Sequence, residues 1–341
     1  MIFKGVELFN VTELRPDPNG NGYEFCRLPA ALDAHLSPAG VRMNHETTGV
    51  EFRFVMKGDS VTLRLMSVPA AEGRAVEAHY VNVYYGNILG GWMDQEVNRV
   101  VYATPTDIVI KRPAAMATYQ KISADYQFPY DPQVVRVILE PGIYRLLDVI
   151  GECEPPTPAQ LPARRYLAYG SSITHGSLAL NPAYYYPTKI GEYFGAETRN
   201  LGFSGSACVE PAVADELAKL DFDFATVEMG INVLSLEAGE FDRRVRYMIK
   251  RLADSHPNAD IFCISPFYCD ADLRGSEKPN EFRRVIDAAV ADYGSPRVHA
   301  INGLSCLDGA HGLSGDLVHP APRGVACIAD ALIAHLKPYL L

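Results

Sequence analysis

A proline-rich stretch divides this 341-residue chain into two halves with different sequence periods. Four prolines fall within residues 154–162. Proline fixes φ and lacks an amide donor, so we expect an extended, fairly stiff linker at 154–163. The sequence therefore predicts two domains, one at 1–153 and one at 164–341, because a chain of this length is comfortable as two folding units.

The first half consists of short runs that alternate apolar and polar residues. Residues 50–56 and 61–65 both alternate, and a cluster of turn-forming residues at 57–60 separates them, which predicts a β-hairpin. Further runs of this kind follow, separated by Gly, Pro and Asp, at 79–85, 99–103, 107–111, 134–140 and 142–148. Short strands at this spacing predict an all-β sandwich, for which we expect a jelly-roll-like arrangement.

The second half alternates predicted strands with amphipathic helices. Apolar runs predict strands at 166–170, 224–230, 260–265 and 297–302. Apolar residues at helical spacing predict helices over 241–252, 282–290 and 325–336. Repeated strand-then-helix order predicts a parallel sheet covered by helices on both faces, which is an α/β fold.

Charge and cysteine usage narrow the class of partner. Asp and Glu number 41 against 31 Lys and Arg, a formal charge of −10, which argues against a nucleic-acid partner. The seven cysteines are odd in number and include no Cys-x-x-Cys pair, which fits a reducing compartment. No run approaches the roughly 18 apolar residues of a membrane span, and no signal peptide is visible, so we expect a cytoplasmic protein with no membrane partner.

Four short motifs fall at the predicted carboxyl rim of the parallel sheet, where open α/β sheets bind ligands. They are Gly-Ser-Ser-Ile-Thr at 170–174, Asn-Leu-Gly-Phe-Ser-Gly at 200–205, Gly-Ile-Asn at 230–232 and Asp-Leu-Val-His at 316–319. Taken alone, each also fits an ordinary turn or a helix cap. Their occurrence together, in an order that a parallel-sheet enzyme needs, predicts an active site.

Each motif supplies a different chemical group. A serine hydroxyl on a tight strand-to-helix turn projects into the crevice, and glycines let backbone N–H groups approach a ligand closely. A side-chain amide at a strand end can donate to developing negative charge. An Asp and a His three residues apart can hydrogen-bond, so that the carboxylate holds the imidazole tautomer.

The four motifs resemble those of the SGNH, or GDSL-like, hydrolases. The family's Gly-Asp-Ser-Ile-Thr, glycine, Gly-x-Asn and Asp-x-x-His blocks all have counterparts here. The residues of the first two motifs resemble those of a subgroup with an N-terminal β-sandwich. Ser171 replaces the Asp of Gly-Asp-Ser, and Val233 replaces an acidic residue that often follows the Asn. The resemblance implies a flavodoxin-like three-layer α/β/α hydrolase domain.

The resemblance also implies a role for each motif residue. Ser172 is the expected nucleophile, His319 its general base and acid, and Asp316 the group that orients His319. The oxyanion hole is expected to consist of the backbone N–H groups of Ser172 and Gly205 and the side chain of Asn232. Neither a metal nor an organic cofactor is expected.

Three further residues are candidate substrate contacts. His175 could line the pocket or merely cap a helix, and Tyr186 could belong to an aromatic wall or simply pack. Trp92, the only tryptophan, could be a carbohydrate platform or an anchor at the domain interface.

The sequence predicts a serine esterase that cleaves short-chain acyl esters, acetyl esters above all, of a carbohydrate or another small molecule. An acyltransferase that uses the same acyl-enzyme is the first alternative. A carbohydrate-binding protein with a degenerate hydrolase domain is a second. No Gly-x-Ser-x-Gly elbow occurs, which disfavours the α/β-hydrolase fold. The expected partner is a small-molecule ester such as an acetylated sugar. The sequence leaves open whether the chain forms a homo-oligomer.

Overall fold

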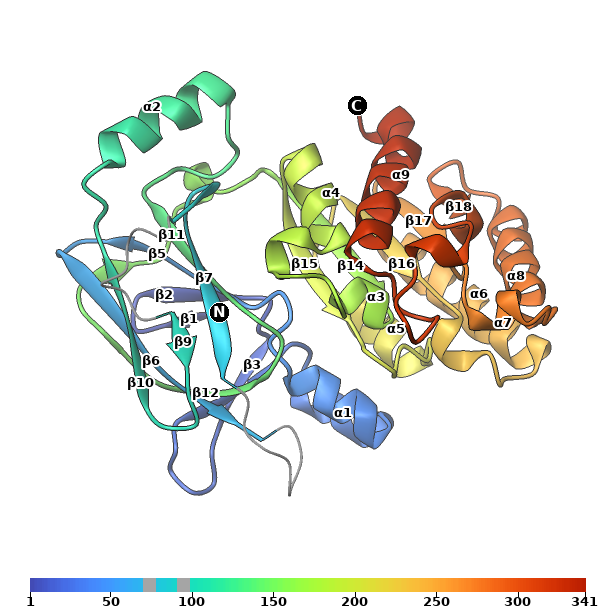
Figure 1. The fold of residues 1–341 in the computed structure, drawn as a ribbon, viewed down its shortest axis with the longest axis horizontal. Coiled ribbons are helices and arrows are strands. Elements are labelled where there is room, and N and C mark those ends of the chain that lie inside the picture. The colour runs from blue at the N-terminus through green and yellow to red at the C-terminus, as the bar shows by residue number, and fades with distance from the viewer. Residues whose placement is uncertain (70–77, 91–98) are drawn as a thin grey trace. The chain divides into compact units, whose positions relative to one another are not determined.

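The computed structural model describes residues 1–69, 78–90 and 99–341, which form two compact units (Figure 1). The first unit comprises residues 1–30 and 44–163, and the second comprises 31–43 and 164–341. The division into two independent domains joined by a linker at 154–163 stays a prediction. No helix among the described residues is long and apolar enough to span a membrane.

The first unit is built from two antiparallel sheets. One sheet has the strand order β1-β2-β5-β11-β7-β8, with β13 added to β5 and β9 to β7, and the other has the order β10-β6-β12-β4-β3. The elements are β1 (Ile2–Phe3), β2 (Val6–Phe9), β3 (Glu13–Pro16), β4 (Tyr23–Cys26), β5 (Glu51–Met56), β6 (Ser60–Val68), β7 (His79–Tyr85), β8 (Ile88–Leu89), β9 (Val100–Val101), β10 (Thr106–Lys111), α2 (Met116–Tyr126), β11 (Val134–Leu139), β12 (Ile143–Ile150), β13 (Cys153–Glu154) and η2 (Pro158–Gln160).

The alternating sequence pattern explains how the two sheets pack. Val61, Leu63 and Leu65 point inward from β6, and every second residue between them is only partly buried. They share one core with Phe52 and Phe54 of β5, which lies in the other sheet. The predicted β-sandwich is confirmed.

The predicted hairpin between residues 50–56 and 61–65 is wrong. β5 and β6 lie in different sheets and do not pair with each other. The backbone N–H groups of Lys57 and Gly58, in the connecting turn, donate to the carbonyl of Glu152 instead of bonding across a hairpin. The turn residues mark a reversal of the chain, but tertiary contacts decide which strand becomes the neighbour.

The second unit contains a five-stranded sheet in the order β15-β14-β16-β17-β18, in which every neighbouring pair is parallel. Most residues of η1 (Ala30–His35) and α1 (Pro38–His45) belong to this unit. The other elements are β14 (Arg164–Gly170), α3 (Ser172–His175), η3 (Pro182–Tyr184), α4 (Tyr186–Phe194), β15 (Ala196–Gly202), α5 (Pro211–Leu217), β16 (Phe224–Glu228), η4 (Ile231–Val233), α6 (Ala238–Ser255), β17 (Asp260–Ile264), α7 (Asp270–Leu273), α8 (Lys278–Tyr293), β18 (Val298–Ile301), η5 (Gly303–Ser305), η6 (Ala310–Gly312) and α9 (Pro322–Leu340).

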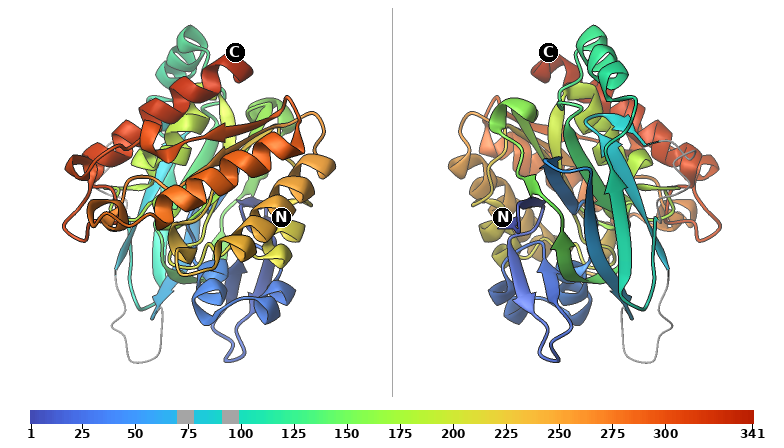
Figure 2. Two further views of the ribbon diagram at one scale, coloured as in Figure 1. Left: turned by 90° about the vertical axis from the view of Figure 1, so that its right-hand side faces the viewer. Right: turned by 90° about the vertical axis from the view of Figure 1, so that its left-hand side faces the viewer.

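Helices cover both faces of this parallel sheet (Figure 2). α4 and α9 contact each other and share a core with alternate residues of the strands, such as Tyr166 and Ala168. α5, α6 and α8 pack side by side on the opposite face. The predicted flavodoxin-like three-layer α/β/α arrangement is confirmed, because both a parallel sheet and two helical layers are present.

Strand register brings the predicted motifs to one edge of the sheet. Gly170 at the end of β14 pairs with Gly202 at the end of β15. On the other side of β14, Tyr169 pairs with Val227, one residue before β16 ends. The loops that follow these three neighbouring strands therefore start side by side at the carboxyl rim.

Candidate active site

Ser172 is the first residue of α3, a helix of four residues that follows β14 directly. Gly170 ends the strand, and a Cβ atom there would overlap the side chains of Thr174 and Glu228, so only glycine fits. Ser171 is the N-cap in extended conformation, and its hydroxyl oxygen accepts the Ile173 N–H at 3.2 Å. The tight turn predicted from the sequence therefore forms, with Ser172 at its tip.

A chain of hydrogen bonds joins Ser172, His319 and Asp316. The Oγ of Ser172 lies 2.8 Å from Nε2 of His319, and Nδ1 of the same ring lies 2.7 Å from Oδ2 of Asp316. Ser172 and His319 are 147 positions apart in the sequence. This arrangement lets the imidazole accept the hydroxyl proton while the carboxylate holds its tautomer.

The loop before α9 holds Asp316 firmly. Its Oδ1 accepts hydrogen bonds from the backbone N–H groups of Val318 and His319 and from the Ser314 hydroxyl, at 2.9, 2.8 and 2.8 Å. Partial burial works to raise the pKa of Asp316, but the bonds from His319, Val318 and Ser314 outweigh it and hold that pKa well below its ordinary value. Asp316 is therefore a carboxylate near neutral pH.

Three hydrogen-bond donors follow the ends of neighbouring strands. The N–H of Ser172 begins α3, and Gly205 has φ of 67° in the turn after β15. Among the described residues, neither N–H has a backbone acceptor. Asn232 lies after β16, and its Oδ1 accepts the Ala207 N–H at 3.1 Å, which leaves its NH₂ group as the donor. These donors have the chemistry that an oxyanion requires.

Glu228, the last residue of β16, has no role in the sequence prediction. Its side chain is buried, and its Oε2 accepts the Ser171 N–H at 2.6 Å and the Thr174 hydroxyl at 3.2 Å. Burial raises the pKa of Glu228, and the bonds from Ser171 and Thr174 oppose that rise. A charged residue inside an apolar strand was the signal in the sequence that could have identified it.

The three candidate substrate contacts have different positions. His175 is buried at the end of α3, where its backbone packs closely against Gly202. Tyr186 has no exposed surface, and its hydroxyl lies 2.6 Å from that of Thr174, so it sits in the core beneath the Ser172 turn. Trp92 lies outside the described residues.

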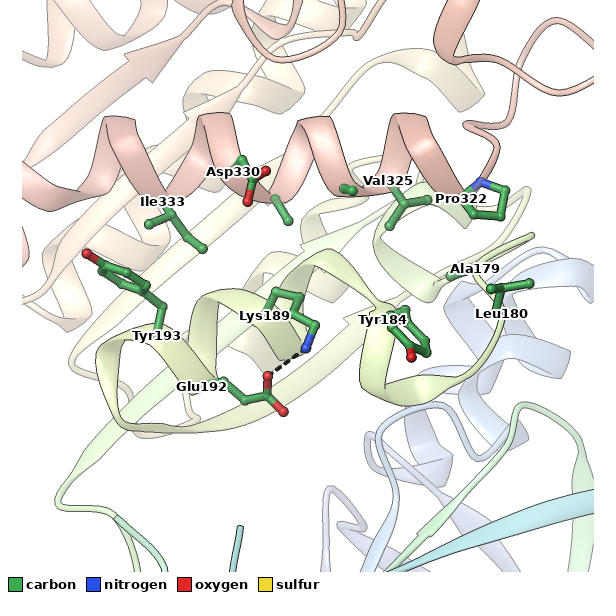
Figure 3. A pocket seen from close by; sticks show the side chains of 12 residues that line it. Ala179, Leu180, Tyr184, Lys189, Glu192, Tyr193, Pro322, Val325, Asp330 and Ile333 are labelled. Carbon is green, nitrogen blue, oxygen red and sulfur yellow. Dashed lines mark hydrogen bonds and ion pairs between the residues drawn. The ribbon is translucent and has the colours of Figure 1, made fainter. Parts of the chain in front are cut away.

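A pocket of about 510 Å³ lies between α4 and α9 (Figure 3). One end is formed by Pro322, three residues beyond His319, together with Ala179 and Leu180, and its walls are largely apolar. The remaining lining residues are Tyr184, Lys189, Glu192, Tyr193, Val325, Ala326, Ala329, Asp330 and Ile333. Of the predicted site residues that the structure describes, none lines this pocket.

The fold and the site together define a class. A parallel sheet covered by helices, with a hydrogen-bonded serine and histidine at its carboxyl rim, is the architecture of an acyl hydrolase. Residues 163–332 match the GDSL-like lipase/acylhydrolase family. This part of the chain belongs to that family, also called SGNH hydrolases, and the protein is a carboxylic ester hydrolase.

Solved structures resemble the fold over nearly the whole chain. A salicylyl-acyltransferase, SsfX3, from a tetracycline biosynthetic pathway has a TM-score of 0.75 at 15% identity, with 98% of this chain and 96% of that chain covered. A family two carbohydrate esterase from Cellvibrio japonicus has a TM-score of 0.64 at 14% identity, with 99% and 96% covered. An acetyl xylan esterase from the rumen bacterium Butyrivibrio proteoclasticus has a TM-score of 0.59 at 12% identity, with 100% and 97% covered. No curated protein matches the sequence.

Proposed function

We propose that this protein hydrolyses short-chain acyl esters, acetyl esters above all, of a carbohydrate or another small molecule. The observation that carries the proposal is the 2.8 Å contact between Ser172 Oγ and His319 Nε2, in a ring whose other nitrogen faces Asp316. Family membership supports ester chemistry, and the esterases among the similar folds favour a sugar ester.

The first half of the reaction forms an acyl-enzyme. Ser172 Oγ attacks the ester carbonyl carbon while its proton passes to His319 Nε2, and Asp316 stabilises the imidazolium that results. The tetrahedral intermediate collapses when the bond from carbon to the alcohol oxygen breaks and His319 gives its proton to that oxygen. Water then attacks the acyl carbon while one of its protons passes to His319. The bond from carbon to Ser172 Oγ breaks, His319 returns the proton to that oxygen, and the acid is released.

Developing negative charge on the carbonyl oxygen needs donors that are already in place. In this proposal the N–H groups of Ser172 and Gly205 and the NH₂ of Asn232 supply them. The bond from Ala207 to Asn232 fixes the amide, so no reorganisation is needed when the charge develops.

The test is hydrolysis of p-nitrophenyl acetate by Ser172→Ala. Activity is expected to vanish, because no other group can form the acyl-enzyme, whereas Ser177→Ala in the same segment is expected to behave as wild type. Labelling by a fluorophosphonate probe should follow the same pattern. Full activity in Ser172→Ala would overturn the proposal, and a folded wild type that does not react with the probe would favour the degenerate binding protein.

Acyl transfer is the second candidate, because hydrolysis and transfer share the same acyl-enzyme and the acyltransferase among the similar folds supports it. The two are separated by product analysis with an added alcohol acceptor. If hydrolysis is the function, the acid dominates over the new ester at moderate acceptor concentration. If the new ester dominates, transfer is the function.

A further inference from the structure

The turn that carries Ser172 rests on a buried carboxyl group from another strand. Glu228 reaches from the end of β16 to Ser171, the residue before Ser172, and to Thr174, two residues after it. Its contacts at 2.6 and 3.2 Å therefore bracket Ser172 on both sides. Thr174 is in turn 2.6 Å from the hydroxyl of Tyr186, which ties the same turn to α4.

We propose that Glu228 is a positioning residue for the nucleophile. In the family motif a carboxyl group stands at position 171, and here Glu228, at the end of β16, supplies a carboxyl group in its place. This inference rests on the proposed role of Ser172. Glu228 acts through the Ser172 turn and does not touch substrate.

A helix as short as α3 cannot fix its own geometry. It has four residues, and a single turn gains little from internal hydrogen bonds. The buried N–H of Ser171 needs an acceptor, and Glu228 provides it. This anchor positions both the Oγ and the N–H of Ser172. Its loss should slow the reaction, because a misplacement of about 1 Å can lower the rate about a hundredfold.

Ser171 and Glu228 form a matched pair. The Ser171 N–H donates to the Glu228 carboxyl, and the Ser171 hydroxyl oxygen accepts the Ile173 N–H. An Asp at position 171 would place a second carboxyl against a buried one, and two carboxyl groups in contact cannot both be ionised. A serine keeps the helix cap and brings no second charge against Glu228.

The first experiment compares kcat and KM for p-nitrophenyl acetate in Glu228→Ala, Glu228→Gln and a control, Ser265→Ala. Ser265 is equally buried after the neighbouring strand β17, and its hydroxyl accepts the Gly303 N–H at 3.1 Å, away from the Ser172 turn. Glu228→Ala is expected to lower kcat roughly ten- to hundredfold with KM nearly unchanged. Ser265→Ala is expected to keep kcat.

Glu228→Gln separates positioning from stability. Its oxygen can still accept from Ser171, so kcat is expected to stay within about threefold of wild type. Its NH₂ group would take the position of Oε1, which is buried without a partner among the described residues, so a lower Tm is expected. An active but less stable Glu228→Gln beside an inactive Glu228→Ala supports the proposal. The proposal would be overturned if Glu228→Ala kept the wild-type kcat in the same assay in which Ser172→Ala shows no activity.

Amide hydrogen exchange provides a readout that does not depend on activity. Exchange in the segment 168–176 is expected to accelerate in Glu228→Ala and to remain as in wild type in Ser265→Ala. If esterase activity were absent in wild type, the proposed function would fail while this measurement still tested the anchor. Unchanged exchange in Glu228→Ala would contradict the anchor itself.

The pairing is tested by a double-mutant cycle. Ser171→Asp alone is expected to lower kcat, and Ser171→Asp combined with Glu228→Gln is expected to recover part of that loss, because one carboxyl is then neutral. Additive losses in the double variant would contradict the pairing.

Discussion

At the scale of single residues, the site depends on how one carboxylate is held. Asp316 receives hydrogen bonds from two backbone N–H groups and a hydroxyl at Oδ1, which leaves Oδ2 for His319. These bonds lower the pKa of Asp316 against the effect of its partial burial, so it remains ionised far into the acid range. The group that orients His319 in our proposal is thus always charged when the imidazole can act as a base.

Asp316→Asn tests this orientation. Asn can still receive the backbone bonds, but its NH₂ could face Nδ1 and favour the wrong imidazole tautomer. We expect kcat to fall by roughly a hundredfold or more, with KM little changed. The measurement is steady-state hydrolysis of p-nitrophenyl acetate. A variant that keeps kcat would show that Asp316 does not orient His319.

Asn232→Ala tests the proposed oxyanion donor. Loss of one such donor lowers kcat by about 10²–10³-fold in serine hydrolases, and binding of the neutral ester should change little. Asn302→Ala is the control, because Asn302 also bonds a backbone N–H, that of Leu304, in a loop beyond β18. Equal kcat values in the two variants would exclude a role for Asn232.

At the scale of elements, the helix pair α4 and α9 encloses the apolar pocket beside the loop of His319. α9 begins only three residues after His319, so its first turn and the imidazole are positioned by the same short segment. An acetyl group does not need a pocket of this volume. A larger acyl or alcohol group would need such space.

Ala326→Phe, at an exposed position of α9 that lines the pocket, tests its use. Turnover of p-nitrophenyl acetate is expected to stay within about twofold, because a surface substitution away from the reacting groups changes little. Turnover of esters with a bulky acyl group is expected to fall, because the phenyl ring fills the space. An equal loss for both esters would place the pocket on the path of the acetyl group.

At the scale of the whole molecule, a buried ion cluster bears on the stability of the first unit. Glu51 bonds to Arg53 at 2.9 Å and to Arg136 at 2.8 Å, and all three side chains are largely buried. Burial works to raise the pKa of Glu51, but the two guanidinium groups lower it to about 2. Because the folded-state pKa is lowered, Glu51 contributes stability above its ordinary pKa of 4.5, and this contribution is lost as the pH falls towards 2.

Glu51→Gln is expected to lower the free energy of unfolding by about 3–5 kcal/mol at pH 7, because two buried guanidinium groups lose the carboxylate that they share. Its stability should also depend less on pH between 4.5 and 2 than that of wild type. Urea unfolding at several pH values measures both effects. Glu154→Gln removes an exposed ion pair with Lys57 and should cost no more than about 1 kcal/mol. Equal effects of the two variants would contradict the interpretation.

The sequence by itself determined the class of each half and the residues that form the proposed site. Alternation at period two and strand-then-helix order are local signals, so the sandwich and the α/β/α layers could be predicted from them. The motifs around Ser172, Gly205, Asn232 and His319 each follow or precede a predictable element, so the carboxyl rim was their expected meeting place.

Only the tertiary structure decided the contacts that no local pattern encodes. It separated β5 from β6, buried Tyr186 in the core, and set Glu228 against a turn 57 residues earlier in the chain. The physical reason is that a local period states which face of an element is buried but not which partner covers it. The partner is selected by packing and by the need of each buried polar group for a hydrogen bond.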